Sequence, residues 1–498
     1  MDATIITNIF GEFSAMAPMI IMIIGALLMP ALYFTTKKRG VVGGALVAFI
    51  LVSLAVNVIL LLGGYVGTYA GLFQYDAFSG LMILLFQIVA FLVALVCTSS
   101  IEVTRLHYGA FASLLLGATT GMMFVATATD LVVIFVGVEL TSISSYVLVA
   151  MKRNDPRAAE AAVKYVIIGG MSTALTIYGL SMLYGVTGTT NLAEIAVSLS
   201  TAGFSWAFGI AMITMIAGYG FKIAAVPFHM WAPDVYEGAP TPVSIFLATG
   251  SKKMGLVVFF KIFLIMFVAG ASVASFATVE MQYLFAIIAA ITMTVGNVVA
   301  ISQTNIKRML AYSSIAQAGY ILIVMAVMSE YALTGGIFHM FTHVFMKGGA
   351  FLIVGALICA GIGEKITDYR GLAKRAPFLA FAMLLFLFSL AGIPPLAGFT
   401  SKFVLFSAAI YGGDGVTSQW VWLAFIAILN SAISLYYYAR VVKAMYIEKG
   451  TATDKIKVPK AFLAAIVICV AAVIVLGVFP QIILGPASEA AAALFSLV

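Results

Sequence analysis

Charged side chains lie in or beside long apolar stretches of this sequence, among them Glu139, Lys222, Lys252 and Lys402. A charge at the centre of a bilayer costs roughly 2.5–3.5 kcal/mol, so in a membrane these side chains must face the protein interior, paired or hydrated. A carboxylate beside a buried lysine stabilises the positive charge, and a change in their separation lets the proton leave. The four residues therefore predict a path for protons.

Individual members of this set allow more than one interpretation. Glu139 is either a structural partner for a lysine or the acidic half of a proton switch with Lys222. Lys252 lies in an apolar run from which its side chain cannot easily reach the membrane surface, which favours a functional role. Lys253 points about 100° away from Lys252 on a helix, so a role in helix packing or lipid head-group contact is equally compatible. The role of Lys261 stays open in the same way.

Three titratable side chains, His339, His343 and Lys347, recur at every fourth position and so share one face of a helix. Two histidines at this spacing can bind a metal, but the residues between them lack the glutamate of a zinc-protease motif. A titrating stripe in a hydrated path fits better, because histidine changes charge near neutral pH. His229, two residues after Pro227, is either a proton relay or a helix cap.

The composition places these residues in a membrane. Of the 498 residues 63% are hydrophobic and 9% are charged, and the mean hydropathy is +1.14. Soluble domains carry about 25% charged residues, so a water-soluble fold is disfavoured. Long apolar runs without alternation favour helices over a barrel. We therefore expect an all-α integral membrane protein.

The three cysteines, Cys97, Cys359 and Cys469, all fall inside apolar runs. They form no CxxC pair, no iron–sulfur spacing and no disulfide framework. Any redox cofactor is therefore expected on another chain, and no cofactor or metal is predicted on this one.

About fourteen spans are long and apolar enough to cross a bilayer. They lie near 15–35, 41–62, 77–98, 109–128, 130–151, 161–184, 204–227, 242–269, 281–301, 307–328, 332–360, 377–411, 418–446 and 461–483.

The loop charges test this numbering. Loops that follow odd-numbered spans hold Lys37, Lys38, Arg39, Arg105, Lys152, Arg153, Arg157, Arg308, Lys365, Arg370, Lys374, Arg375, Lys449, Lys455 and Lys457. Loops that follow even-numbered spans hold Asp76, Asp130, Glu194, Glu280, Glu330 and Asp414, with no Lys or Arg. The positive-inside rule then places the basic loops in the cytoplasm and both termini outside. The net charge of +7 is thus a topology signal, and no nucleic-acid partner is expected.

Two spans contain proline within their apolar run. The span 204–227 runs through Lys222 into Pro227, and the span 377–411 holds Gly-Ile-Pro-Pro before Lys402. Proline removes a helical hydrogen bond, which a membrane tolerates only where the break is buried or wet. A broken, lysine-bearing helix in each half predicts two related five-helix units and indicates transport sites.

The sequence around the first break also resembles a known family. Residues 220–244 read GFKIAAVPFHMWAPDVYEGAPTPVS, and further matches are GVEL at 137–140, AAVKY at 161–165, KRMLAYSS at 307–314 and AGIPPLAGFTSKF at 391–403. These segments are similar to the NuoN-type antiporter-like membrane subunits of respiratory complex I and related complexes, including F420H2 dehydrogenase. The resemblance runs from about residue 130 to about residue 440.

This resemblance implies fourteen helices, with inverted five-helix repeats formed by helices 4–8 and 9–13 and with helices 7 and 12 broken. The corresponding domains are an N-terminal unit at 1–108, the two repeats at 109–270 and 281–446, and a C-terminal helix within 460–498. It also implies an acid–lysine pair on helices five and seven, a bridging lysine on helix eight and an exit-side lysine on helix twelve. These positions are Glu139, Lys222, Lys252 and Lys402.

One stretch departs from that pattern. Residues 339–350, HMFTHVFMKGGA, look more like the sibling antiporter-like subunits and the Mrp antiporters. This departure weakens the assumption that NADH is the electron donor and makes F420H2 or ferredoxin a credible alternative, with quinone or methanophenazine as acceptor. Flavin and iron–sulfur clusters are expected on partner subunits. The expected surroundings are a soluble redox arm, other antiporter-like and small membrane subunits, and the plasma membrane of a prokaryote.

Two functions remain open on the sequence alone. The first is a proton-translocating subunit of a redox-driven complex, without a redox site on this chain. The second is a subunit of an Mrp-type cation/proton antiporter without redox chemistry. The 220–244 segment favours the first, and the number of buried lysines disfavours a mere membrane scaffold.

Overall fold

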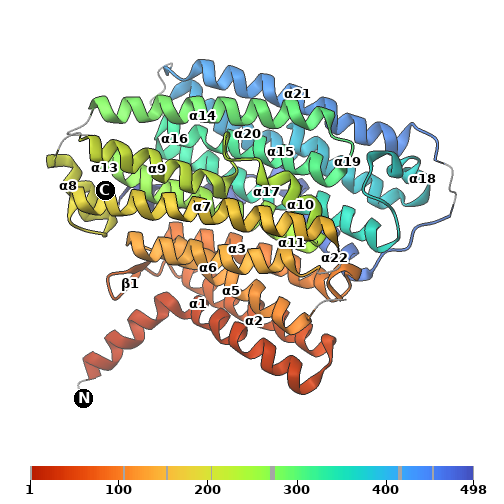
Figure 1. Cartoon of the computed structure of the whole chain (residues 1–498), viewed down its shortest axis with the longest axis horizontal. Coiled ribbons are helices and arrows are strands. Elements are labelled where there is room, and N and C mark those ends of the chain that lie inside the picture. The colour runs from red at the N-terminus through yellow and green to blue at the C-terminus, as the bar shows by residue number, and fades with distance from the viewer. Residues whose placement is uncertain are drawn as a thin grey trace.

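The computed structural model describes residues 3–104, 107–152, 155–202, 205–269, 275–412, 418–450 and 454–496. Arg105, Arg153 and Asp414 of the loop-charge pattern lie outside these ranges. Long helices run side by side along the longest axis of the molecule (Figure 1). The strands among the described residues form one small antiparallel hairpin, β1 (Gly67–Tyr69) and β2 (Phe73–Tyr75). The prediction of an all-α membrane fold is confirmed.

Twelve helical segments in the described part of the chain are long and apolar enough to cross a membrane. They lie in α1 (Ala3–Thr36), α2 (Arg39–Leu62), α3 (Ala77–Cys97), α5 (Tyr108–Thr127), α6 (Leu131–Ala150), α7 (Pro156–Thr187), α9 (Trp206–Ile223), α14 (Ser275–Ser302), α15 (Ile306–Ile321) continued by α16 (Ile323–Val327), α17 (Glu330–Cys359), α21 (Val421–Tyr446) and α22 (Lys460–Val478).

The other two predicted spans are helical but are made of shorter pieces. The first is a continuous run that contains two π-helical turns: α11 (Thr241–Phe246), η1 (Leu247–Ser251), α12 (Lys252–Phe259), η2 (Phe260–Leu264) and α13 (Ile265–Ala269). The second consists of α19 (Pro377–Ala391) and α20 (Ala397–Tyr411). The count of fourteen and the inversion of the repeats stay predictions.

Both predicted helix breaks are confirmed. Helix α9 ends before Ala224, whose φ of 55° is left-handed, and the chain resumes as α10 (Trp231–Gly238) after Pro227. Helix α19 ends before Gly392, whose φ is 92°, and α20 begins after the prolines. A left-handed residue stops a helix, and proline cannot donate the next helical hydrogen bond.

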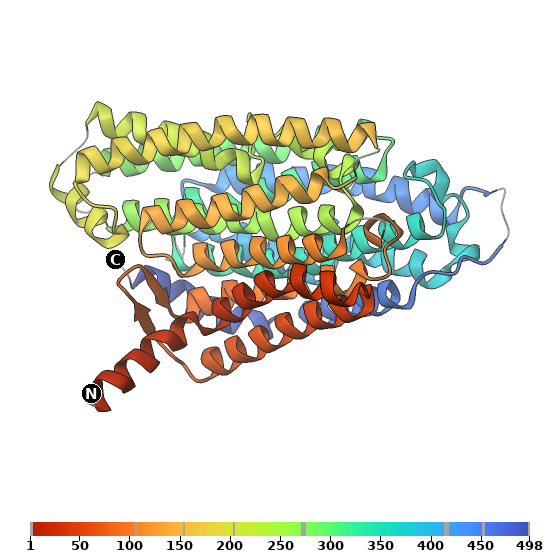
Figure 2. The same cartoon turned by 60° about the horizontal axis from the view of Figure 1, so that its bottom comes forward.

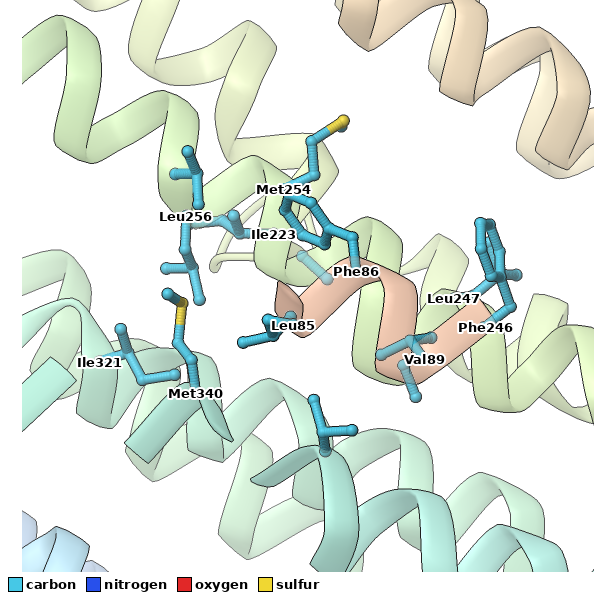
Figure 3. Packing of buried hydrophobic residues seen from close by; sticks show 14 of the residues in the cluster. Leu85, Phe86, Val89, Ile223, Phe246, Leu247, Met254, Leu256, Ile321 and Met340 are labelled. Carbon is cyan, nitrogen blue, oxygen red and sulfur yellow. The ribbon is translucent and has the colours of Figure 1, made fainter. Parts of the chain in front are cut away.

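Helix α17 forms the centre of the bundle, and nearly all of its side chains are buried. Figure 3 shows Leu85, Phe86 and Val89 of α3 packed near Met254 of α12 and Met340 of α17. By contrast, α2 and α7 expose many large apolar side chains, as helices in contact with lipid do. The titratable groups on α17 therefore lie far from lipid.

The two ends of the bundle differ in charge. Both chain ends lie at the end that carries the β1–β2 hairpin and α8 (Leu192–Ala202), as Figures 1 and 2 show. The opposite end carries the basic turns at η4 (Ile366–Tyr369) and α18 (Leu372–Arg375). Two short helical elements complete the chain: α4 (Ile101–Thr104) and α23 (Gln481–Phe495). This arrangement agrees with the loop-charge pattern, and the orientation in the membrane stays a prediction.

Candidate functional site

Lys222 occupies the last turn of α9, directly before the first helix break, and is buried. Its Nζ donates a hydrogen bond to Ser142 Oγ on α6 at 2.7 Å. The ring centroids of Tyr146 and Tyr165 lie 6.0 and 5.8 Å from the same nitrogen. The C-terminal end of a helix carries partial negative charge, and aromatic faces attract cations, so this site stabilises a positive charge.

Glu139 lies on α6 beside this site but does not form an ion pair with Lys222. The carboxylate is half-buried and accepts a hydrogen bond from Thr173 Oγ1 at 2.9 Å. Glu139 and Lys222 line one narrow cavity of about 10 Å³, about the space that one water molecule needs. Glu139 acts electrostatically on the lysine from there. Glu139 therefore faces the neighbouring helix α7 and a small cavity shared with Lys222, and its part in a proton switch stays a prediction.

Two adjacent lysines open α12, and both are buried. Lys252 Nζ lies 5.7 Å from the centroid of the Tyr236 ring, and among the described residues it has no hydrogen-bond partner. Lys253 is 0% exposed and likewise lacks a partner in the described chain. A lipid head-group role for Lys253 is therefore wrong, since neighbouring helices cover this face of α12 as well.

The titratable stripe on α17 is fully buried, and both ring nitrogens of His339 have a hydrogen-bond partner. Its Nδ1 lies 2.9 Å from Ser401 Oγ and its Nε2 lies 2.9 Å from Gln317 Oε1. The His343 ring lies 6.3 Å from the His339 ring, and its nitrogens have no hydrogen-bond partner among the described residues. Lys347 Nζ donates to Ser313 Oγ at 2.5 Å and to the carbonyl of Leu310 at 3.2 Å.

Lys402 lies on α20, beyond the second break, and reaches back across it. Its Nζ donates to the carbonyl oxygens of Leu390 and Ala391, at 2.7 and 3.2 Å, and to Ser431 Oγ at 2.9 Å. The Tyr320 ring centroid lies 5.0 Å away. A cavity of about 340 Å³, lined mainly by apolar side chains that include Phe399, adjoins this ammonium group.

His229 lies in the loop between α9 and α10 and is buried. It does not cap α10 with its side chain, because the residue at the cap position is Met230. Its Nδ1 has no partner in the described part of the chain, and Lys252 acts on it electrostatically. His229 is thus not the N-cap of α10, and the relay interpretation and the cap interpretation for the end of the broken span both stay open.

These groups form one electrostatically connected set. Lys252 interacts with His229 and His343, and Lys253 interacts with both histidines of α17. Lys402 in turn interacts with His339 and Lys347. Like charges oppose each other in a low-dielectric interior, so a proton on one member disfavours a proton on the next. Such an arrangement can pass charge stepwise from the first break toward the second.

An ion-pair network at the basic end of the bundle was missed. Asp234 on α10 accepts from Lys164 at 2.6 Å and from Arg308 on α15 at 2.6 Å, and Arg308 also binds Glu237 at 2.9 Å. Burial by itself raises the pKa of Asp234, but the hydrogen bonds from Lys164 and Arg308 outweigh it and lower that pKa. The segments 161–165, 220–244 and 307–314 contain these residues, but nothing in the segments indicates that the residues pair.

Membrane-spanning helices, two of them broken beside a buried lysine, define a multi-pass membrane protein of the transporter class. Residues 128–434 match the family described as NADH:quinone oxidoreductase/Mrp antiporter, TM. The chain belongs to this family, as its resemblance at 220–244 indicated.

Curated relatives and solved structures agree with this assignment. The chain is 45% identical to F420H2 dehydrogenase subunit N of Methanosarcina mazei over 416 residues, 82% of each chain. It is 40% identical to NADH-quinone oxidoreductase subunit N of Desulfitobacterium hafniense, over 87% of this chain and 88% of that one. Its structure is similar to a chain of respiratory complex I from Thermus thermophilus, with a TM-score of 0.78 and 28% identity, covering 94% and 98% of the two chains. A chain of an archaeal membrane-bound sulfane sulfur reductase gives a TM-score of 0.86 at 25% identity, covering 98% of each.

Proposed function

We propose that this chain is a proton-translocating membrane-arm subunit of a complex I-type, redox-driven pump. The observation that carries the proposal is the connected set of buried lysines and histidines between the two broken helices. Ionisable groups inside a membrane protein mark ion pathways and proton relays. The curated relatives at 40–45% identity are named as subunits of redox complexes, which supports the redox coupling.

In this mechanism the charge balance at the first break starts the transfer. A loss of negative charge near Lys222, by protonation or displacement of Glu139, weakens the hold on the Lys222 proton. The Lys222 N–H bond breaks and the proton moves to Lys252, which has no competing hydrogen bond among the described residues. It then passes by His343 and His339 to Lys402, and leaves from there. His229 serves as a side relay to Lys252, and Lys347 sets the charge next to His343.

The electron-transfer chemistry belongs, in this proposal, to partner subunits. A soluble arm with flavin and iron–sulfur clusters oxidises NADH, F420H2 or ferredoxin and passes electrons to quinone or methanophenazine. Other antiporter-like and small membrane subunits lie beside this chain in the plasma membrane of a prokaryote, with both termini on the outer side. The printed names of the relatives support a complex of this kind.

The competing function is cation/proton antiport without redox chemistry, since the family description includes Mrp antiporters. The two functions differ in what purifies with the chain. A redox pump brings flavin and iron–sulfur absorbance with it, and an antiporter complex shows neither. Absence of both cofactors from an intact native complex would overturn the redox proposal.

A variant tests the proton path in the same preparation. Lys222→Ala removes the first lysine, so donor-driven proton uptake by membrane vesicles should fall about tenfold or more. Lys443→Ala is the matched control, because this lysine lies on α21 with a side chain that is 61% exposed. Full pumping by an assembled Lys222→Ala complex would contradict the assigned path.

A further inference from the structure

A further buried lysine, Lys261, lies outside the proposed path. Lys261 belongs to the second π-helical turn, η2, and is 3% exposed. Its Nζ donates to the carbonyl oxygen of Ala128 at 2.7 Å and lies 6.0 Å from the Phe78 ring centroid. The acidic group that acts on it electrostatically is Asp76, the buried N-cap of α3. An ammonium group has three donors, and within the described chain only the Ala128 carbonyl accepts from this one.

A cavity of about 170 Å³ lies on the other side of Ala128: this residue lines the cavity and its carbonyl oxygen accepts from Lys261, which does not itself line the cavity. Ile265 also lines the cavity, and it follows Lys261 by one helical turn on the same face. The polar part of the lining comes from Thr68, Gln74, Thr129 and Asn191. These residues belong to the hairpin region, the connection between α5 and α6 and the segment before α8, at the end of the bundle where both chain ends lie (Figure 1).

The cavity beside Lys261 is better suited to water than the one beside Lys402. A cavity holds water where several polar groups line it, and the larger cavity at Lys402 is walled mainly by Phe399, Phe403 and other apolar side chains. At Lys261 hydroxyl and amide side chains line the cavity, and they lead toward the end of the bundle. Lys261 is separated from this cavity by one residue, Ala128, so a local movement there would let the lysine exchange its proton with cavity water.

We propose that Lys261 is a second proton outlet, which serves the first half of the chain and opens through this cavity. The proposal rests on the proposed function, since it needs a proton on Lys252. In the step, a Lys261 N–H bond breaks and the proton passes to cavity water, leaving a neutral amine. A proton from the Lys252 ammonium, carried by water over about 14 Å of helix, restores the charge. No electrons move, and each proton released at the outer end is replaced from the path.

The first experiment separates a proton carrier from a structural cap. Lys261→Gln keeps a donor for the Ala128 carbonyl but carries no exchangeable charge, and Lys261→Met removes both. In vesicles with the native complex, we expect both variants to lower protons pumped per electron pair to about half of wild type or less, at unchanged donor oxidation. Wild-type pumping in Lys261→Gln with a loss only in Lys261→Met would show a cap and overturn the outlet. Wild-type pumping in both would overturn it too.

The second experiment tests the cavity itself. Thr68→Cys places a thiol on its exposed side, and a positively charged, membrane-impermeant methanethiosulfonate reagent should then slow pumping about twofold or more by repelling the Lys261 proton. Leu62→Cys, exposed near the same end but off the cavity, is the control and should not respond. Equal rates before and after modification of Thr68→Cys would overturn the outlet. Loss of pumping in Lys222→Ala without any effect at Lys261 or Thr68 leaves the proposed function standing and removes only this inference.

Discussion

The two helix breaks hold their lysines at equivalent places by different means. At the first break, Lys222 is part of the last turn of α9 and ends beside Ser142. At the second, Lys402 comes from α20 and reaches back to the last carbonyls of α19. Both ammonium groups therefore lie at the C-terminal end of the first helical piece, where unpaired carbonyls favour a cation. Each break thus forms a site for a cation, whether the lysine comes from the helix before the break or from the helix after it.

The surroundings of the two ammonium groups differ in what controls their charge. Lys222 has one hydroxyl acceptor, two tyrosine rings and Glu139 nearby. Lys402 has three oxygen acceptors, and among the described residues no carboxylate forms an ion pair with it. The charge on Lys222 therefore depends on an acid that can change its protonation or position. The charge on Lys402 depends on the geometry of the break itself.

The largest expected effect on proton pumping comes from removing the negative charge of Glu139. Glu139→Gln keeps the size of the side chain and its hydrogen bond from Thr173 but removes the negative charge. We expect donor-driven proton pumping to fall about tenfold, because Lys222 then lacks the negative charge that controls its proton. Glu139→Asp is the matched control and should retain a substantial part of the rate. Equal pumping by wild type and Glu139→Gln would mean that both breaks are controlled by geometry alone.

The sequence was sufficient to predict the helical spans and both breaks. Apolar length defines a span, and the prolines near 227 and 394 remove hydrogen bonds whatever their neighbours are. The same information placed His339, His343 and Lys347 on one face, since helical spacing is local. Features that depend only on residue spacing along one helix could therefore be predicted from the sequence.

Contacts between helices were not predictable in this way. Glu139 was expected to face the interior, paired or hydrated, but spacing does not reveal that it accepts from Thr173 on α7 and shares a cavity with Lys222 instead of forming an ion pair. Lys253 was assigned to a different face from Lys252, which is correct, but that face is also covered by neighbouring helices. The ion pair of Asp234 with Arg308 joins α10 to α15 over a long sequence separation, so no local pattern indicates it.

A smaller effect is expected from the hydroxyl acceptors at the two breaks. Ser142→Ala removes the one hydrogen-bond acceptor that the described chain offers to Lys222. Ser431→Ala leaves Lys402 with two carbonyls. An intramolecular hydrogen bond contributes about 0.5–1.5 kcal/mol net, equivalent to about 2- to 13-fold in rate, so pumping should fall about fivefold in Ser142→Ala and less than about twofold in Ser431→Ala. The opposite ranking of the two rates would show that Lys402 is the more weakly held lysine.

The helices that follow the two breaks, α10 and α20, are also held in place by different interactions. Helix α10 is held by the ion pairs of Asp234 with Lys164 and Arg308. Helix α20 is held by hydrogen bonds, from Gly398 N–H to Ser389 Oγ at 3.0 Å and between Ser401 and His339. The ion pairs of α10 depend on pH in the acidic range because the carboxylate must stay ionised, whereas the Gly398–Ser389 hydrogen bond contains no titratable group.

The smallest expected effect follows from the lowered pKa of Asp234. A carboxyl group whose folded-state pKa lies below its unfolded value of about 3.9 stabilises the fold above that value, and this contribution disappears as the pH falls through the folded-state pKa. At pH 7, Asp234→Asn should lower the thermal midpoint of the purified complex by a few degrees, measured by intrinsic fluorescence, to which Trp231 on α10 contributes. At about pH 3 the difference in thermal midpoint between wild type and Asp234→Asn should shrink. Ser389→Ala, the matching change at the second break, should lower the thermal midpoint by the same amount at both pH values. A difference for Asp234→Asn that does not change with pH would mean that packing, and not the ion pair, holds α10 in place.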